Sequence, residues 1–211
     1  MINKASTPKR GLFVVLEGID GSGTTTQVKL VSESLGRRNY SVHCTREPSD
    51  GPIGRLIRCV LSGQIELDRG DDTMALLFAA DRMDHLKREV QPALDRGMIV
   101  LCDRYYYSSM AYQSSDERSE MFTRTVNGKA RPPDLTIVLE VGLEEAQRRL
   151  DYRARKDYTE TIQIQKKVHA WYNGIRNKFT HLILTLDGAA EPISISSQIC
   201  LAIERTLNGE L

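Results

Sequence analysis

The 211-residue sequence has little excess charge, few cysteines and no long apolar run, and each absence excludes a class of protein. Lys plus Arg is 29 and Asp plus Glu is 28, so a net charge of +1 gives no support to a general nucleic-acid binder or a polybasic membrane protein. No run approaches the about 18 apolar residues that a membrane helix requires. The four cysteines lie far apart, without a CxxC pair or a histidine at metal-ligand spacing. A secreted, disulfide-built, membrane or zinc protein is largely excluded, and we expect a reduced, cytoplasmic protein.

What the sequence does contain is an alternation of short apolar runs with longer amphipathic ones. Buried strands are expected at 12–16, 41–45, 98–102, 135–139 and 182–186. Helices are expected at 24–37, 53–62, 72–96, 143–154, 160–178 and 192–207. This alternation indicates an α/β fold, a doubly wound five-stranded parallel sheet with helices on both faces. Ligands of such folds bind beyond the carboxyl ends of the strands.

The chain offers no repeat, low-complexity segment or linker at which to divide it, so we expect a single domain over residues 1–211. Residues 1–10 are polar and predict a flexible N-terminal tail rather than a secretory signal. Residues 114–131 are polar and lack strong periodicity at the ends of the segment, so we expect a surface excursion there. Pro132 and Pro133 stop any helix before the fourth strand.

A glycine-rich turn follows the first strand and leads into the first helix. Its residues are Gly18, Ile19, Asp20, Gly21, Ser22, Gly23, Thr24, Thr25 and Thr26. Gly18 and Gly23 occupy the glycine positions of the phosphate-loop pattern G-x-x-x-x-G-K-[ST], and Thr25 stands where a hydroxyl ligates Mg²⁺. Glycine lets backbone N–H groups curl around phosphate oxygens, and the helix start adds its own. We expect the turn to bind ATP phosphates, although Thr24 replaces the lysine. The alternative is a glycine-rich turn that binds nothing.

Further motifs follow in the same reading order. They are Thr45-Arg46-Glu47-Pro48, Leu77-Phe78-Ala79-Ala80-Asp81-Arg82, Asp103-Arg104-Tyr105, Ser108-Ser109-Met110-Ala111-Tyr112-Gln113 and Pro132-Pro133-Asp134-Leu135. In this order and spacing the set resembles the thymidylate kinases, which phosphorylate dTMP with ATP, from about residue 11 to residue 207. Gly21 resembles the bacterial form, whose phosphate loop lacks an arginine and whose lid supplies basic residues instead. The resemblance implies a P-loop NTPase-like fold, Mg²⁺ and a homodimer.

Charged residues at the strand ends are the candidates for phosphoryl transfer, which needs positive charge around the moving group. Arg104 follows the third strand and is expected to hold the acceptor phosphate, the alternative being a surface ion pair. By resemblance Arg58 contacts the same phosphate, unless it is an ordinary helix-surface arginine. Asp103 is expected to hold the Mg²⁺ shell through water or to cap the next helix. By resemblance Asp20 approaches the sugar 3′-hydroxyl and the reacting phosphates, and Glu47 contacts the substrate or orients arginines.

Base recognition is assigned by the resemblance. It implies that Phe78 stacks on thymine and that Arg82 reaches the O4 edge of the base. Ser109 and Gln113 complete the contacts to that edge. Tyr112 crowds the sugar 2′ position and so favours deoxyribose. The alternative for Phe78 is plain core packing within its helix.

Residues 148–156 hold five basic residues and one acid. The functional interpretation is a mobile lid, at about 148–160, that closes over ATP and excludes water. The alternative is a solvated helix end whose cations favour the helix dipole. Because Thr24 carries no charge, our hypothesis is that Arg153 or Arg155 supplies the missing charge to the phosphates.

The leading hypothesis is a dTMP kinase that converts Mg·ATP and dTMP to ADP and dTDP. One alternative is a kinase for another deoxynucleotide or nucleoside. A second is a catalytically weak nucleotide-binding homologue, which Thr24 suggests. The expected partners are dTMP, ATP and a second copy of the chain, with no nucleic acid and no membrane.

Overall fold

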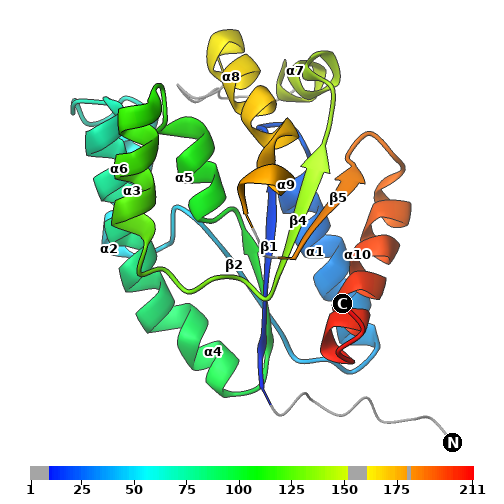
Figure 1. The fold of residues 1–211 in the computed structure, drawn as a ribbon. Coiled ribbons are helices and arrows are strands. Elements are labelled where there is room, and N and C mark those ends of the chain that lie inside the picture. Colours follow the sequence, from blue (N-terminus) through cyan, green and yellow to red (C-terminus); the bar gives the residue numbers. More distant parts are fainter. Residues whose placement is uncertain (1–9, 152–160, 180–181) are drawn as a thin grey trace, which may run out of the picture.

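The protein is described by a computed structural model that covers residues 10–151, 161–179 and 182–211. Within these ranges a wholly parallel five-stranded sheet runs in the order β2-β3-β1-β4-β5 (Figure 1). The strands are β1 (Leu12–Gly18), β2 (Val42–Arg46), β3 (Ile99–Asp103), β4 (Leu135–Glu140) and β5 (Ile183–Asp187). Each overlaps its predicted range, and the doubly wound parallel sheet is confirmed. The predicted tail falls almost wholly outside the described residues.

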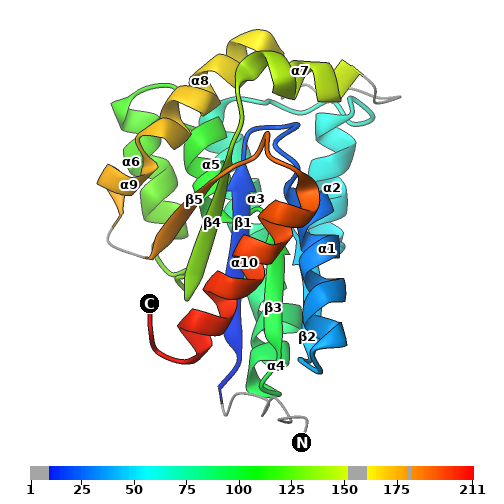
Figure 2. The same ribbon diagram turned by 90° about the vertical axis from the view of Figure 1, so that its right-hand side faces the viewer.

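Helices cover both faces of the sheet, which is why the strands are apolar throughout (Figures 1 and 2). Leu12, Val14 and Leu16 of β1 pack with α1 (Thr24–Arg37) and α10 (Pro192–Leu207). Phe13 and Val15 face the opposite way, toward α5 (Tyr106–Tyr112) and α8 (Ile162–Asn173). A satellite cluster forms where α2 (Pro52–Leu61) meets α3 (Asp71–His85).

The helix predicted at 72–96 is continuous but changes its winding. After α3 comes a π-helical turn, η1 (Leu86–Val90), and then α4 (Gln91–Asp95). The Gln91 N–H bonds the carbonyl of Leu86, five residues back. Pro92 follows and has no N–H to donate, which disrupts the regular ladder. The wide turn places Glu89 beside β2, where it contacts His43.

The prediction of a surface excursion at 114–131 is wrong, because the segment contains the helix α6 (Glu117–Asn127). Asp116 begins it with a capping box: its carboxylate accepts from the Ser119 N–H at 2.7 Å, and the Ser119 hydroxyl accepts from the Asp116 N–H at 3.0 Å. The buried residues of α6 are Ser119, Thr123 and Asn127. They have helical spacing but are polar, so hydrophobic periodicity does not reveal them.

The remaining helices are α7 (Leu143–Asp151) and α9 (Ile175–Lys178). The helix predicted at 160–178 is divided, because α8 ends at Asn173 and Gly174 separates it from α9. Of the helices in the three described ranges, none is long and apolar enough to cross a bilayer.

The carboxyl ends of β1, β3 and β4 meet at one edge of the sheet. Leu16 lies opposite Asp103, and Gly18 lies opposite Leu139. The glycine-rich turn after β1 therefore emerges beside Arg104, which follows β3, as their places in the sequence predict.

Candidate active site

The glycine-rich turn forms a tight loop between β1 and α1. Gly21 and Gly23 have φ angles of +85° and +99°, which disfavour any other residue. A Cβ at Gly21 would also lie 2.6 Å from the Ala146 carbonyl oxygen of α7. The helix α1 begins directly after Gly23 without a side-chain cap. The N–H groups of its first turn are therefore available to an anion, as the phosphate-loop pattern predicts.

A cavity of about 530 Å³ lies on one side of this loop. It is enclosed by the start of α1, by α7 and by the turn from Gly188 to Pro192. Arg149 of α7 lines it and donates from Nη1 to the Gly21 carbonyl at 3.3 Å and from Nη2 to the Gly188 carbonyl at 3.0 Å. Sequence reasoning counted Arg149 only within a basic run and missed the 188–192 turn, which carries no charge pattern. We call this space the donor cavity.

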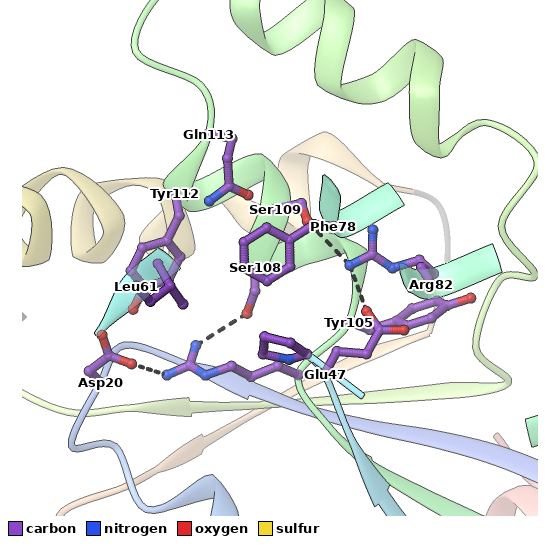
Figure 3. Close-up of a pocket in the computed structure, with 12 residues that line it drawn as sticks. Asp20, Glu47, Leu61, Phe78, Arg82, Tyr105, Ser108, Ser109, Tyr112 and Gln113 are labelled. Atoms are coloured by element: carbon purple, nitrogen blue, oxygen red, sulfur yellow. Dashed lines mark hydrogen bonds and ion pairs between the residues drawn. The ribbon is translucent and has the colours of Figure 1, made fainter. Parts of the chain in front are cut away.

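A second cavity, of about 150 Å³, lies on the other side of the loop (Figure 3). The predicted residues that line it are Asp20, Glu47, Phe78, Arg82, Arg104, Ser109, Tyr112 and Gln113. The wall also contains Pro48, Leu61, Tyr105 and Ser108, to which sequence reasoning assigned no site role. The structure thus brings residues from three helices (α2, α3 and α5) and from the segments after three strands (β1, β2 and β3) into one hollow. We call it the acceptor cavity.

Arg104 joins the two sides of the site. Its φ of +70° is unusual for arginine, a conformation that costs about 1 to 3 kcal/mol and is common at functional sites. Its Nη1 donates to the Gly18 carbonyl at 2.8 Å, and its Nη2 contacts Asp20 Oδ1 at 2.5 Å. Arg104 and Asp20 do form an ion pair, which was the alternative expected for Arg104. The pair is not on the open surface, however, because the two side chains are only 20% and 15% exposed and both line the cavity. The guanidinium therefore stands between the phosphate loop and the acceptor cavity.

Thr25 and Asp103 lie together at the base of the loop. The Thr25 hydroxyl donates to Asp103 Oδ2 at 2.5 Å. Asp103 Oδ1 is shielded from solvent and has no hydrogen-bond partner in the described part of the chain. A hydroxyl beside a carboxylate with a free oxygen fits Mg²⁺, which binds through few protein oxygens and the phosphates of its nucleotide. The alternative that Asp103 caps the next helix is wrong, because Tyr105 is the N-cap of α5.

Several residues that line the acceptor cavity carry buried polar atoms without a partner among the described residues, and one of these atoms is the Tyr112 hydroxyl. Arg82 is 1% exposed and pairs through Nη2 with Glu47 Oε2 at 2.6 Å and with the Ser109 hydroxyl at 3.2 Å. Its Nη1 also contacts Asn127 of α6. Arg82 Nε and Gln113 Oε1 are buried and have no partner among the described residues. Glu47 does orient an arginine, as one expectation held.

Phe78 and Arg58 occupy different surroundings. Phe78 packs against the α2–α3 cluster and also lines the acceptor cavity, so core packing and a site role coincide. Arg58 does not line the cavity; its Nη1 and Nη2 donate to the carbonyls of Pro48 at 2.6 Å and Ser49 at 2.7 Å. It thereby supports the cavity wall at Pro48. Arg153 and Arg155 lie outside the described residues, so their expected role stays a prediction.

Glu17 and Gln165 are buried residues whose hydrogen bonds hold the phosphate loop and the strand end that leads into it. Glu17 is fully buried and accepts from the Ser108 hydroxyl and the Tyr172 hydroxyl, each at 2.6 Å. Burial raises the pKa of Glu17 to about 7, although these bonds oppose the rise. Gln165 donates from Nε2 to Asp20 Oδ2 at 2.8 Å and accepts from the Asp20 N–H at 3.2 Å. The only sign of these contacts in the sequence is that Glu17 is an acidic residue within the otherwise apolar strand β1.

A phosphate loop flanked by two cavities at one sheet edge is the arrangement expected of a phosphoryl-transfer enzyme, which binds a donor and an acceptor. Residues 16–199 match the family model of thymidylate kinase, and the chain belongs to the thymidylate kinase family. It is 37% identical over 204 residues to a probable thymidylate kinase of Pyrococcus horikoshii, a match that covers 95% of this chain and 99% of the relative. A probable thymidylate kinase of Methanococcus maripaludis is 44% identical over 197 residues, covering 93% and 94%. These relatives are archaeal, and the likeness of Gly21 to the bacterial form rests on the loop sequence alone.

Proposed function

We propose that the protein transfers the γ-phosphoryl group of ATP to dTMP, giving dTDP and ADP. The observation that carries this proposal is the position of Arg104, whose guanidinium lies between the phosphate loop and the acceptor cavity. Positive charge at that point stabilises the oxygens of a phosphoryl group as it passes between two phosphates. Membership of the thymidylate kinase family supports the same reaction.

The donor cavity fits ATP. The start of α1 and the loop N–H groups bind its phosphates, and the turn from Gly188 to Pro192 leaves room for the nucleoside. Thr25 and Asp103 are the residues that would hold Mg²⁺. When bound, the metal neutralises phosphate charge and so favours phosphoryl transfer. Arg149 of α7 donates to the Gly21 carbonyl and so helps to hold the loop in place beside this cavity.

The free groups of the acceptor cavity select the base. Thymine presents the O4 acceptor beside the N3–H donor, which complements the Arg82 Nε donor and the Gln113 Oε1 acceptor. Cytosine presents the opposite pattern, an amino donor beside an N3 acceptor. A mismatched base would leave both buried groups unpaired, at about 1 to 3 kcal/mol for each. Phe78 supplies a flat apolar partner, and Tyr112 closes the sugar side of the cavity.

We also propose that the protein is a single-domain, cytoplasmic homodimer. Leu76, Ala80 and Met83 are exposed and have helical spacing along α3, with Leu76 52% and Met83 43% exposed. An apolar stripe of this kind is suited to pair with the same stripe of a second copy. Light scattering tests it: wild type should have the mass of a dimer, and Leu76→Arg should have the mass of a monomer.

The reaction is tested by steady-state ADP release with Mg²⁺, ATP and a set of monophosphates. We expect dTMP to have the highest kcat/KM, dUMP to follow, and dCMP to fall at least about 100-fold below dTMP, because two buried groups lose their partners. Arg104→Lys keeps the charge but loses the planar fork and should lower kcat. Arg118→Lys, whose side chain is 74% exposed and away from the cavity, is the matched control. Equal rates with dCMP would indicate a kinase for another deoxynucleotide.

The replacement of the loop lysine by Thr24 raises the alternative of a catalytically weak nucleotide-binding homologue. Thr24→Lys should raise ADP release if the threonine is a simple defect, and a fall means that the loop is adapted to threonine. We propose that Arg153 or Arg155 supplies the missing charge. The loss expected for Arg153→Ala or Arg155→Ala exceeds tenfold in kcat, about 1.4 kcal/mol, with Lys156→Ala as the control. Smaller losses in both variants would rule out this compensation.

A further inference from the structure

A line of ionisable side chains runs from the acceptor cavity to the surface at β2. Arg82 Nη2 lies 2.6 Å from Glu47 Oε2, and Glu47 Oε1 lies 3.2 Å from His85 Nδ1. His85 Nε2 lies 3.7 Å from Glu89 Oε2, and Glu89 Oε1 lies 2.9 Å from His43 Nε2. Basic and acidic side chains alternate along this line. Only its inner end, at Arg82 and Glu47, reaches the cavity (Figure 3).

The residues of this line come from a strand and a helix, and each element places them on one face through its own side-chain repeat. His43, Thr45 and Glu47 are alternate residues along β2 and the loop after it, so they share one face of the strand. Arg82 and His85 are three positions apart on α3, and the π-helical turn that follows places Glu89 on the same side. The helix and the strand therefore present matching rows of groups to each other.

The inner part of the line is sealed from water. The side chains of Arg82, Glu47 and His85 are 1%, 2% and 0% exposed, whereas those of Glu89 and His43 are 36% and 30% exposed. A buried ion pair is stable only when its remaining atoms are also paired. Glu47 meets this condition, since one carboxylate oxygen faces Arg82 and the other faces His85.

Both nitrogens of His85 have polar partners. Nδ1 faces Glu47, and Nε2 faces the Thr45 hydroxyl at 2.7 Å with Glu89 beyond it. Burial alone lowers the pKa of His85, but the hydrogen bond to Glu47 and the charges of Glu47, Glu89 and Asp81 outweigh it, so the pKa is raised. The cation Arg82 lies on the far side of Glu47. The surroundings of His85 therefore favour its charged form more than burial alone would.

We propose that His85 is a positioning residue that sets base selectivity by holding Glu47 against Arg82. With Oε1 held by His85, Glu47 presents Oε2 alone to Arg82, and the Arg82 Nε–H stays free for the base. Without that hold, the carboxylate can turn, take Arg82 through both oxygens and occupy Nε. His85 does not line the cavity, so it acts through Glu47. The inference deepens the proposed function and rests on its acceptor site.

The test compares His85→Leu, which removes the donor to Glu47, with His85→Asn, whose side-chain amide replaces Nδ1–H. We expect His85→Leu to raise the KM for dTMP at least about tenfold and to lower the dTMP-to-dCMP ratio of kcat/KM at least about fivefold, with the KM for ATP unchanged. His85→Asn should stay within about threefold of wild type. His43→Asn, at the solvent-exposed end of the line, is the matched control. Equal losses for both His85 variants, or parallel losses for dTMP and ATP, would overturn the proposal.

A second measurement needs neither turnover nor a folded His85 variant. Nuclear magnetic resonance titration of the histidine rings in wild type should give His85 a pKa above the ordinary histidine value. Glu47→Gln should lower that pKa. If the pKa of His85 does not change in Glu47→Gln, the proposed coupling between His85 and Glu47 is overturned. If the titration behaves as expected while no monophosphate supports ADP release, the coupling stands and the proposed function fails, so the two failures are distinguishable.

Discussion

Glu17→Gln should remove a pH dependence from the stability of the protein. Burial raises the pKa of Glu17 from 4.5 to about 7 against the opposing bonds from Ser108 and Tyr172. An acid with a raised folded pKa binds its proton more tightly when folded, so its ionisation lowers the free energy of unfolding as pH rises between the unfolded and folded values. The shift of 7 − 4.5 = 2.5 units, at about 1.36 kcal/mol per unit, corresponds to about 3 kcal/mol, most of it lost between about pH 5 and about pH 8.

The assay is urea unfolding of wild type and Glu17→Gln over that pH range. Subtracting the two free energies of unfolding cancels the other titrating groups, His85 among them. Because glutamine stays neutral, the variant should gain about 2 to 3 kcal/mol relative to wild type from about pH 5 to about pH 8. Tyr172→Phe keeps the acid but removes a donor to its ionised form, so it should steepen the pH dependence. A difference that stays constant within about 0.5 kcal/mol refutes the reasoning.

Three other substitutions test separate parts of the structure. Gly21→Ala puts a Cβ 2.6 Å from the Ala146 carbonyl at a φ of +85°, so the KM for ATP should rise at least about tenfold in ADP-release assays; an unchanged KM would contradict the loop geometry. Asp103→Asn should raise the Mg²⁺ concentration that gives half-maximal rate, and an unaltered Mg²⁺ titration would remove Asp103 from the metal site. Asp116→Ala should cost about 1 kcal/mol in urea unfolding with kcat unchanged, because it removes the capping box of α6; equal stability would show that the cap does not hold the helix.

The sheet and the strand-end residues were predictable because their signals are local. The apolar runs of β1 and β3 mark strands buried on both faces, and parallel strands bring Gly18, Asp103 and Arg104 to one edge whatever the connections contain. The acceptor residues of α3 and α5 were expected from the resemblance to the thymidylate kinases, and they lie in one cavity.

The parts that sequence reasoning missed depend on distant partners. The bond between Glu17 and Tyr172 joins residues 155 positions apart, and Gln165 meets Asp20 over 145 positions. No periodicity links such pairs. The helix α6 was missed for a different reason, since its buried face is polar and satisfied by hydrogen bonds such as the one from Thr123 to the Gln113 carbonyl. Hydrophobic patterns report burial only where apolar residues carry it.

The phosphate loop is held by α7, whose last turn overlaps the start of the expected lid, and by α8, which follows the expected lid in the sequence. Arg149 of α7 ties down the carbonyl at Gly21, and Gln165 of α8 clasps Asp20 one position earlier. The short backbone arc of Asp20 and Gly21, which lies within the phosphate loop, is therefore anchored by side chains from the two helices that flank residues 152–160.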